Sequence, residues 1–194
     1  LSAGYVASYW LQMAVVFSFL VILPLGEHFH IVTALPALFF RRGRPANRVP
    51  RVDIDKLMEA TDEADMKAGV RTVRDLTWKE GLDAFTCTEC GRCKDACPTF
   101  LTGKPLSQKA VNDSLKHHLL AQRRTLLAPG AERDALPALV GEVIGEDTLW
   151  ACITCGYCEP ACPIELEHVP RFFKLRQHRV LMDGVFPHEL KAVF

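Results

Sequence analysis

The sequence lacks the features of several large functional classes. Its 23 Lys and Arg residues balance 23 Asp and Glu residues, and a net charge of zero argues against a nucleic-acid binder held by bulk electrostatics. It contains no phosphate-binding glycine loop and no nucleophile motif of a hydrolase or transferase. No stretch shows the sustained alternation of apolar and polar residues that predicts β-strands. We therefore expect an all-α protein with no nucleic-acid partner.

Charge is also absent from the first part of the chain. Residues 1–26 read LSAGYVASYWLQMAVVFSFLVILPLG, and the first charged residue is Glu27. About 20 apolar residues in a helix cross a bilayer core, so this run predicts one transmembrane helix. The alternative is a cleavable signal peptide, which would need a basic start, a shorter apolar run and a small-residue cleavage site. Because Leu1 is not a Met, we expect a fragment that other membrane helices or subunits precede.

The segment from Arg41 to Arg51 contains five Arg and no acidic residue. Short loops rich in Lys and Arg stay on the cytoplasmic side of a membrane. We therefore expect a protein of the cell membrane whose C-terminal part faces the cytoplasm. Contact of these Arg side chains with anionic headgroups explains the run better than nucleic-acid binding does.

All eight Cys lie between residues 87 and 162. They form two copies of C-x2-C-x2-C-x3-C, and each copy is followed by a proline. The segments CTECGRCKDACP and CITCGYCEPACP share seven of twelve positions, which are the four Cys, one Gly, one Ala and the Pro. Three thiolates at this spacing let one tight loop bind three corners of a cubane cluster. Gly91 and Gly156 are expected to let backbone N–H groups approach sulfide, because they have no Cβ.

Zinc and disulfides are the alternatives to iron–sulfur clusters. Zinc usually takes paired C-x2-C knuckles, and a disulfide framework is disfavoured on the cytoplasmic side of a membrane. We therefore predict two 4Fe-4S clusters. In two-cluster ferredoxins the fourth Cys of each motif binds the other cluster, which predicts crossed ligands. The first cluster would take Cys87, Cys90, Cys93 and Cys162, and the second would take Cys152, Cys155, Cys158 and Cys97.

The long interval between the two motifs favours helices. Ser107 can cap a helix whose apolar residues recur every four positions, and Leu126–Leu127 precedes a stop signal at Ala-Pro-Gly. Ala135–Ile144 is a further helical candidate, and Pro170 suits the first turn of another helix. We predict a membrane helix and exit segment over 1–40, a basic loop and helical connector over 41–74, and a dicluster domain over 75–194.

Two longer segments resemble a known family. They read GVRTVRDLTWKEGLDAFTCTECGRCKDACP and DTLWACITCGYCEPACPIELEHV. Together with the preceding apolar helix, they resemble membrane-anchored iron–sulfur oxidoreductases related to heterodisulfide reductase, especially the branch that oxidises electron transfer flavoprotein and reduces menaquinone. The resemblance implies an α-helical ferredoxin domain similar to that of the succinate dehydrogenase iron–sulfur subunit. It also implies a soluble flavoprotein donor and menaquinone or ubiquinone as the membrane acceptor.

The membrane part of that family is similar to the cytochrome b subunit of nitrate reductase. There a P-x5-H motif near the end of the last helix supplies a haem ligand, and Pro24 followed by His30 matches it. The resemblance therefore implies that His30 is an axial ligand of haem b, with His28 as the competitor. Because residues two apart point to different sides of a helix, we expect that one haem does not take both. The upstream His found in the family is absent, since that region has Gln12.

The function expected from the resemblance is electron transfer through the two clusters, between a soluble flavoprotein and a haem and quinone site in the membrane. Larger family members carry a downstream catalytic domain with CCG motifs, and residues 1–194 contain no such motif. Two alternatives stay open. One is a heterodisulfide-reductase-like subunit that moves electrons from quinol to a disulfide. The other is a membrane anchor for a partner dehydrogenase.

Overall fold

The computed structural model describes residues 3–26, 28–41, 43, 49–61, 67–128 and 136–192. These residues form helices and loops and include no β-strand, so the expectation of an all-α chain is confirmed. The helices are α1 (Ala3–Ile22), η1 (Leu23–Leu25), α2 (Phe29–Phe39), α3 (Ile54–Glu59), η2 (Val73–Asp75), α4 (Trp78–Thr86), α5 (Arg92–Asp95), α6 (Pro98–Leu101), α7 (Gln108–Ala121), α8 (Arg123–Leu127), α9 (Leu139–Glu142), α10 (Glu146–Ala151), α11 (Val169–Leu181) and η4 (His188–Ala192).

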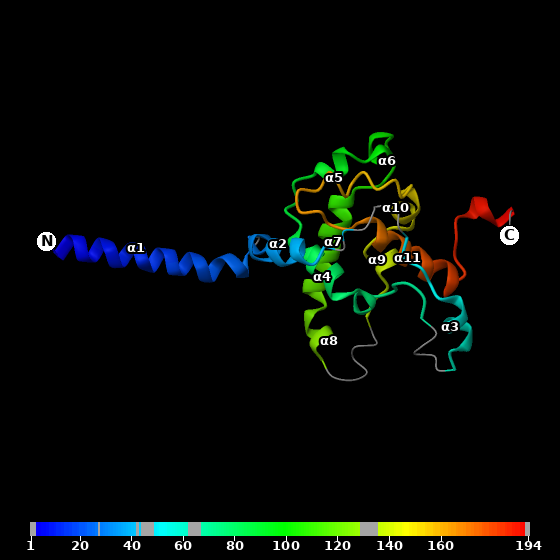
Figure 1. Cartoon of the computed structure of the whole chain (residues 1–194), viewed down its shortest axis with the longest axis horizontal. Helices are drawn as coiled ribbons and strands as arrows, with labels where there is room; N and C mark the ends of the chain where they lie inside the picture. The colour runs from blue at the N-terminus through cyan, green and yellow to red at the C-terminus, as the bar shows by residue number, and fades with distance from the viewer. Residues whose placement is uncertain are drawn as a thin grey trace.

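Helix α1 projects away from the rest of the chain (Figure 1) and has no buried residue. Together with η1 it gives the 23-residue segment Ala3–Leu25, which is long and apolar enough to cross a membrane. The helix ends where Pro24 enters a single 3-10 turn and Gly26 takes an extended conformation. The chain therefore carries one N-terminal apolar helix that is suited to a membrane.

The predicted exit segment folds as a second apolar helix, α2, which packs on α4. Thr33 and Ala37 are buried on the side of α2 that faces the domain. At one end of the contact the rings of Phe29 and Phe85 meet edge to face, with centroids 6.1 Å apart. Helix α2 thus joins α1 to α4, the helix that leads into the first Cys motif.

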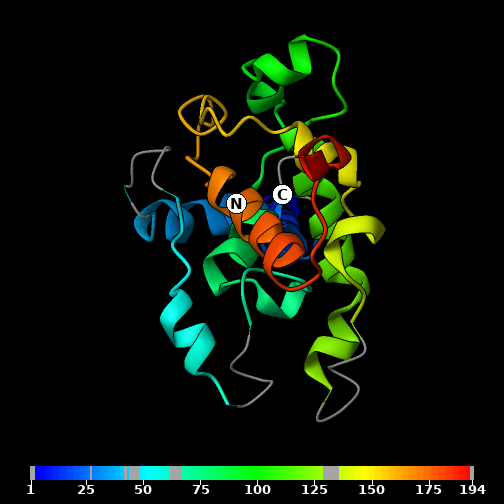
Figure 2. The same cartoon turned by 90° about the vertical axis from the view of Figure 1, so that its right-hand side faces the viewer.

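The core of the domain lies among α4, α7, α10 and α11. Its fully buried apolar side chains include Leu115, Leu149, Phe172 and Leu175. In the view along the long axis (Figure 2), α11 lies in the middle, with α2 and α3 on one side and α7 and α8 on the other. Helix α11 therefore connects the two sides of the domain.

The helix signals of the sequence have mixed outcomes. Ser107 caps α7 by accepting a hydrogen bond from the backbone N–H of Ala110, and Pro170 lies in the first turn of α11. The prediction of a helix over Ala135–Ile144 is wrong. Of its described part, only Leu139–Glu142 forms a turn, and Gly141 within it has φ 100°. The signal came from apolar residues, but these are buried in a folded loop rather than along a helix.

The connector contributes a backbone contact to α11. Helix α3 occupies only Ile54–Glu59 of the expected helical stretch, and residues 62–66 lie outside the described part. Beyond them, the N–H of Val70 donates to the carbonyl of Lys174 at 3.0 Å. A Cβ on Gly69 would lie 2.1 Å from that same carbonyl oxygen, so this close approach requires glycine.

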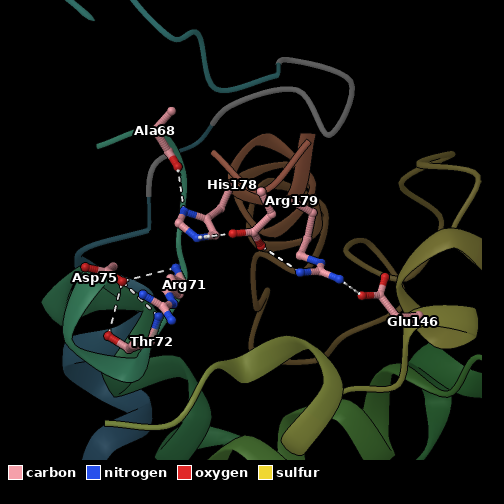
Figure 3. Close-up of polar contacts among 8 residues, drawn as sticks. Ala68, Arg71, Thr72, Asp75, Glu146, His178 and Arg179 are labelled. Carbon is pink, nitrogen blue, oxygen red and sulfur yellow. Dashed lines mark hydrogen bonds and ion pairs between the residues drawn. The ribbon is translucent and has the colours of Figure 1, made fainter. Parts of the chain in front are cut away.

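A polar network fixes the end of α11 (Figure 3). Nδ1 of His178 lies 3.1 Å from the carbonyl oxygen of Ala68. The neighbouring Arg179 pairs with Asp183 at 2.7 Å and with Glu146 on α10. These contacts hold α11 between the connector and the helix that enters the second Cys motif.

Candidate metal centres

The two Cys motifs begin in the same local structure. Cys87 follows directly on α4, and Cys152 follows directly on α10. Two residues later the chain takes positive φ at Glu89 (54°) and at Thr154 (56°), and it does so again at Gly91 (83°) and Gly156 (80°). A left-handed conformation costs a residue with a Cβ about 1–2 kcal/mol.

The motif glycines have a conformational role in the loops. Gly91 and Gly156 take positive φ, which favours glycine, and a Cβ on Gly91 would meet no atom of the described chain within 4 Å. The approach of backbone N–H groups to sulfide stays a prediction. The positive φ of Glu89 and Thr154 was not predicted, because neither residue type marks a left-handed position.

The thiols differ in exposure by their order in the motif. Cys90 and Cys155, the second Cys of each motif, are exposed, whereas the third and fourth of each motif are buried. The repeated motif therefore gives two loops in which the second, third and fourth thiols have matching exposure, whereas the first thiol is half-buried at Cys87 and buried at Cys152.

The fold brings the fourth Cys of the first motif to the second motif. Cys97 lines a small cavity together with Cys152, Cys155 and Cys158. Gln108 and Val169 complete part of its wall. We call these four cysteines the second thiol site.

The fourth Cys of the second motif lies with the first motif. Burial raises the pKa of Cys93 to about 11, with further contributions from the nearby Cys87 and Cys162 thiols. Burial likewise raises the pKa of Cys162, and the neighbouring Cys90 adds to this effect. We call Cys87, Cys90, Cys93 and Cys162 the first thiol site. Metal binding requires deprotonated thiols, so burial without a metal opposes the charge that a metal would stabilise.

The two thiol sites approach each other at one point. Cys93 and Cys158, the third Cys of each motif, are buried in one apolar cluster with Val169. Phe173, one turn further along α11, packs against the same cluster. The first residue of α11 therefore lies between the two sites.

Around the second thiol site the chain supplies donors. Nε2 of Gln108 lies 4.0 Å from Sγ of Cys152. The guanidinium of Arg176 donates to the carbonyl oxygens of Leu149 and Cys152 at 2.6 and 2.5 Å. It also lies over the ring of Trp150, 5.2 Å from the centroid. Burial lowers the pKa of Arg176, and the Cys152 thiol opposes that shift.

Around the first thiol site there is a buried polar network. Arg171 is fully buried and donates to Oδ1 of Asn112 at 2.9 Å. Nδ2 of Asn112 in turn donates to the carbonyl oxygen of Ala84 at 3.1 Å. Burial lowers the pKa of Arg171, while Asp83, Glu80 and Cys87 act in the opposite direction. No sequence signal pointed to Arg171 or Asn112, because neither belongs to a motif or a recognisable spacing.

The candidate haem ligands lie at the start of α2. His30 is half-buried in its first turn, and His28 is the exposed residue that precedes it. The centroids of the two rings lie 6.2 Å apart. His28 is outside the helix (φ −81°, ψ 5°), so helical spacing does not apply to this pair. That one haem does not take both side chains stays a prediction. One imidazole from this segment fits an axial ligand of a haem, and a second would have to come from another helix.

The ligand chemistry fits clusters better than single ions. Within the described ranges, no three His, Cys, Asp or Glu side chains come close enough to hold one metal ion. A 4Fe-4S cluster instead binds four thiolates, each on a separate iron atom. Two groups of four cysteines, each gathered around one loop, satisfy that donor set.

Comparison with known proteins agrees with this interpretation of the cysteines. Residues 79–163 match the family model of the 4Fe-4S dicluster domain. The chain is 32% identical over 206 residues to a probable iron–sulfur-binding oxidoreductase, FadF, of Bacillus subtilis, covering 91% of this chain and 28% of that protein. It is 30% identical over 205 residues to the EtfAB:quinone oxidoreductase of Syntrophomonas wolfei, covering 96% and 28%. No solved structure matches the chain.

Two further relatives match this chain over shorter segments. A probable membrane-anchored ferredoxin of Chromohalobacter salexigens is 32% identical over 142 residues, which cover 65% of this chain and 21% of that protein. One component of the ferredoxin:CoB-CoM heterodisulfide reductase of Methanosarcina mazei is 30% identical over 112 residues, covering 58% and 56%. The suspected relation to membrane-anchored iron–sulfur oxidoreductases is thereby confirmed. The chain spans little more than a quarter of the first two relatives.

Proposed function

Starting from the relation to iron–sulfur oxidoreductases, we propose that each thiol site holds one 4Fe-4S cluster, with the fourth ligands crossed between the motifs. The observation that carries this proposal is the cavity that Cys97 shares with Cys152, Cys155 and Cys158. A bound cluster supplies reversible one-electron transfer. The chain itself buries most of the thiolates, leaves Cys90 and Cys155 exposed, and holds the two sites together.

The order of the two sites follows from what surrounds them. Helix α4 ends at Cys87 of the first thiol site, and its Phe85 contacts Phe29 of α2. Arg41, just after α2, pairs with Glu165, three residues after Cys162. The first thiol site is therefore the one joined to the membrane helices. At the second thiol site, the exposed Cys155 lies between the exposed Ile153 and Tyr157, which suits the approach of a soluble redox protein.

The buried cluster of Cys93, Val169 and Cys158 gives a link between the two sites. We propose that the chain carries electrons between a soluble flavoprotein, similar to electron transfer flavoprotein, and a quinone site in the membrane. The cluster domain would face the cytoplasm, as the Arg-rich segment predicts. Of that segment, Arg42 and Arg44–Arg48 lie outside the described residues. Support for the donor and acceptor comes from the similarity to an EtfAB:quinone oxidoreductase.

The proposed haem b would be bound through His30. The position of His30 beside Phe29, whose ring contacts Phe85, supports this role because it would bring a haem near the first thiol site. Its ring must be neutral to bind iron, and an acceptor on the other ring nitrogen would fix the tautomer. His28 is the weaker candidate, because its side chain lies outside the helix and is exposed.

A test separates these proposals in the intact native complex. His30→Ala is expected to remove a haem absorbance band and to stop quinone reduction by the flavoprotein, while both clusters stay reducible by dithionite. His28→Ala is the matched control and is expected to keep the haem. A haem-replete His30→Ala complex with normal quinone reduction would contradict the haem proposal. Clusters that no physiological donor reduces would favour the membrane-anchor alternative.

One observation favours a second candidate function. The match to the heterodisulfide reductase component of Methanosarcina mazei covers 56% of that polypeptide, a larger share than the chain covers of the longer relatives. Under this alternative, the chain would pass electrons from quinol towards a CCG-containing catalytic domain that reduces a disulfide. Quinol-dependent reduction of a disulfide by the native complex, with no flavoprotein activity, would select it.

A further inference from the structure

The outer face of α2 is apolar and uncovered. On the inner side, Thr33 and Ala37 are 5% and 1% exposed where they pack on the domain. On the outer side, Leu35 is 77% exposed and Phe39 is 81% exposed. Ile31 and Val32 add to the same exposed surface. An apolar face of this kind on a monomer is a site of interaction with another molecule or with lipid.

The length of α2 decides whether it can cross a membrane or lie at its surface. Helix α2 has 11 residues, which at 1.5 Å per residue is about half of the hydrocarbon thickness. It contains no charged residue. An apolar helix that is too short to cross and is exposed along one face suits the boundary between headgroups and acyl chains.

The domain adds an aromatic residue to this face. Trp78, the first residue of α4, is 64% exposed. Its ring lies edge to face with Phe40, with centroids 5.1 Å apart, and Phe40 meets Phe39 at 4.9 Å. Trp and Tyr side chains gather at the interface of a bilayer because their rings are amphipathic. Arg41 follows directly, as expected for a residue at headgroup depth.

The position of α2 in the chain, close to α1, identifies what covers its outer face. Only η1 and residues 26–28 separate α2 from the membrane-crossing candidate α1. A chain that leaves the bilayer at Leu25 must therefore have α2 at the membrane surface. We propose that the outer face of α2, together with Trp78, is embedded in lipid at the interface. This surface, the α2–Trp78 face, would seat the dicluster domain on the bilayer with the first thiol site towards the membrane. The inference rests on the proposed membrane crossing of α1.

Tryptophan fluorescence of the full chain in lipid nanodiscs tests the proposal. The chain has three Trp, at positions 10, 78 and 150, so Phe substitutions give three single-Trp variants. Each is compared in nanodiscs of unbrominated lipid, of lipid brominated on the acyl chains near the headgroup and of lipid brominated deep in the acyl chains, and each is titrated with aqueous iodide. The ratio between matched lipids cancels any quenching by the clusters.

The expected result is strong lipid quenching of Trp78 with little quenching by iodide. Trp10 reports on α1 and should be quenched by lipids brominated deep in the bilayer, whereas Trp150, on α10, should be quenched by neither lipid. Leu35→Glu is expected to lower the lipid quenching of Trp78 roughly twofold or more, because a charge at the interface opposes insertion. The matched control is Leu127→Glu at another exposed position, 82% exposed on α8, which should have no effect.

The outcomes that overturn the proposal are distinct. Quenching of Trp10 by lipid but of Trp78 only by iodide would show that the α2–Trp78 face is in water, while the membrane crossing of α1 stands. Protection of Trp78 from both quenchers would show that protein covers the face instead of lipid. Absence of lipid quenching at both Trp10 and Trp78 would reject the membrane crossing and this inference together.

Discussion

The first and second thiol sites are built from two twelve-residue motifs that share seven positions, yet the sites lie in different electrostatic surroundings. Both motifs begin after a helix and turn through two residues with positive φ at equivalent positions. Beyond these loops the likeness ends. The first site lies near the buried network of Arg171 and Asn112, and the second receives the amide of Gln108. A motif thus determines the shape of a ligand loop, whereas distant segments determine the charge around it.

This difference bears on electron transfer. The potential of a 4Fe-4S cluster rises when hydrogen bonds and cations stabilise its more negative, reduced form. At the second site Gln108 approaches a thiol directly, and Arg176 is fixed on the backbone of the same cysteine. At the first site the cation is Arg171, and buried Asp83 partly offsets it. Substitutions at four kinds of position test how far the two sites differ.

The largest effect is expected from removal of a crossed ligand. Cys97→Ser should damage the cluster of the second thiol site, and Cys162→Ser should damage that of the first. Each variant should lose about half of the roughly eight iron atoms. Iron analysis together with electron paramagnetic resonance measures this. Loss of the cluster at Cys87, Cys90 and Cys93 in Cys97→Ser would show that the ligands are not crossed.

The next effect concerns the buried cation near the first site. Arg171→Met should lower the free energy of unfolding by about 3 kcal/mol, because it removes the buried donor to Asn112 and one of the two cations that offset Asp83, of which only Lys79 would remain. The spectrum of the first cluster should broaden while the second is retained. Chemical denaturation measures the stability. Arg179→Met, on the same helix but partly exposed, is the control and should cost less than about 1 kcal/mol. Equal losses in the two variants would contradict a special role for Arg171.

A smaller effect is expected at the second site. Gln108→Leu removes the amide near Sγ of Cys152 and should lower the reduction potential of that cluster by about 40 mV. A net hydrogen bond contributes about 1 kcal/mol, and 59 mV corresponds to about 1.4 kcal/mol for one electron. A potentiometric titration followed by electron paramagnetic resonance measures both clusters. Gln177→Leu, whose amide donates to Pro50 instead, should leave both potentials unchanged.

The smallest effects test the likeness of the loops. Gly91→Ala and Gly156→Ala should each destabilise the protein by about 1 kcal/mol, because both residues have positive φ. Gly81→Ala in the interior of α4 is the control and should be neutral or stabilising, since no atom lies within 4 Å of the added Cβ. Thermal unfolding of the three variants measures the difference. Clearly unequal costs at Gly91 and Gly156 would show that the two loops differ locally.

Several elements of this protein could be predicted from its sequence, because the sequence signals for them are local. The uncharged run predicted α1, the capping Ser107 predicted the start of α7, and Pro170 predicted the first turn of α11. Two copies of one Cys motif predicted a dicluster domain, which the family match confirms. The helix prediction failed where apolar residues are buried in a loop, as over 136–144, where Gly141 takes positive φ.

The apolar helix α1, the starts of α7 and α11 and the spacing of the Cys ligands follow from the amino-acid order alone, because each depends on residues within about one or two turns of each other. Two features follow instead from the packing of the folded chain: Arg171 is buried near the first motif, and α2 packs on α4. These features depend on which distant segments bury one another. Burial and the charge near a thiol are properties of that packing, so no local pattern of residues specifies them.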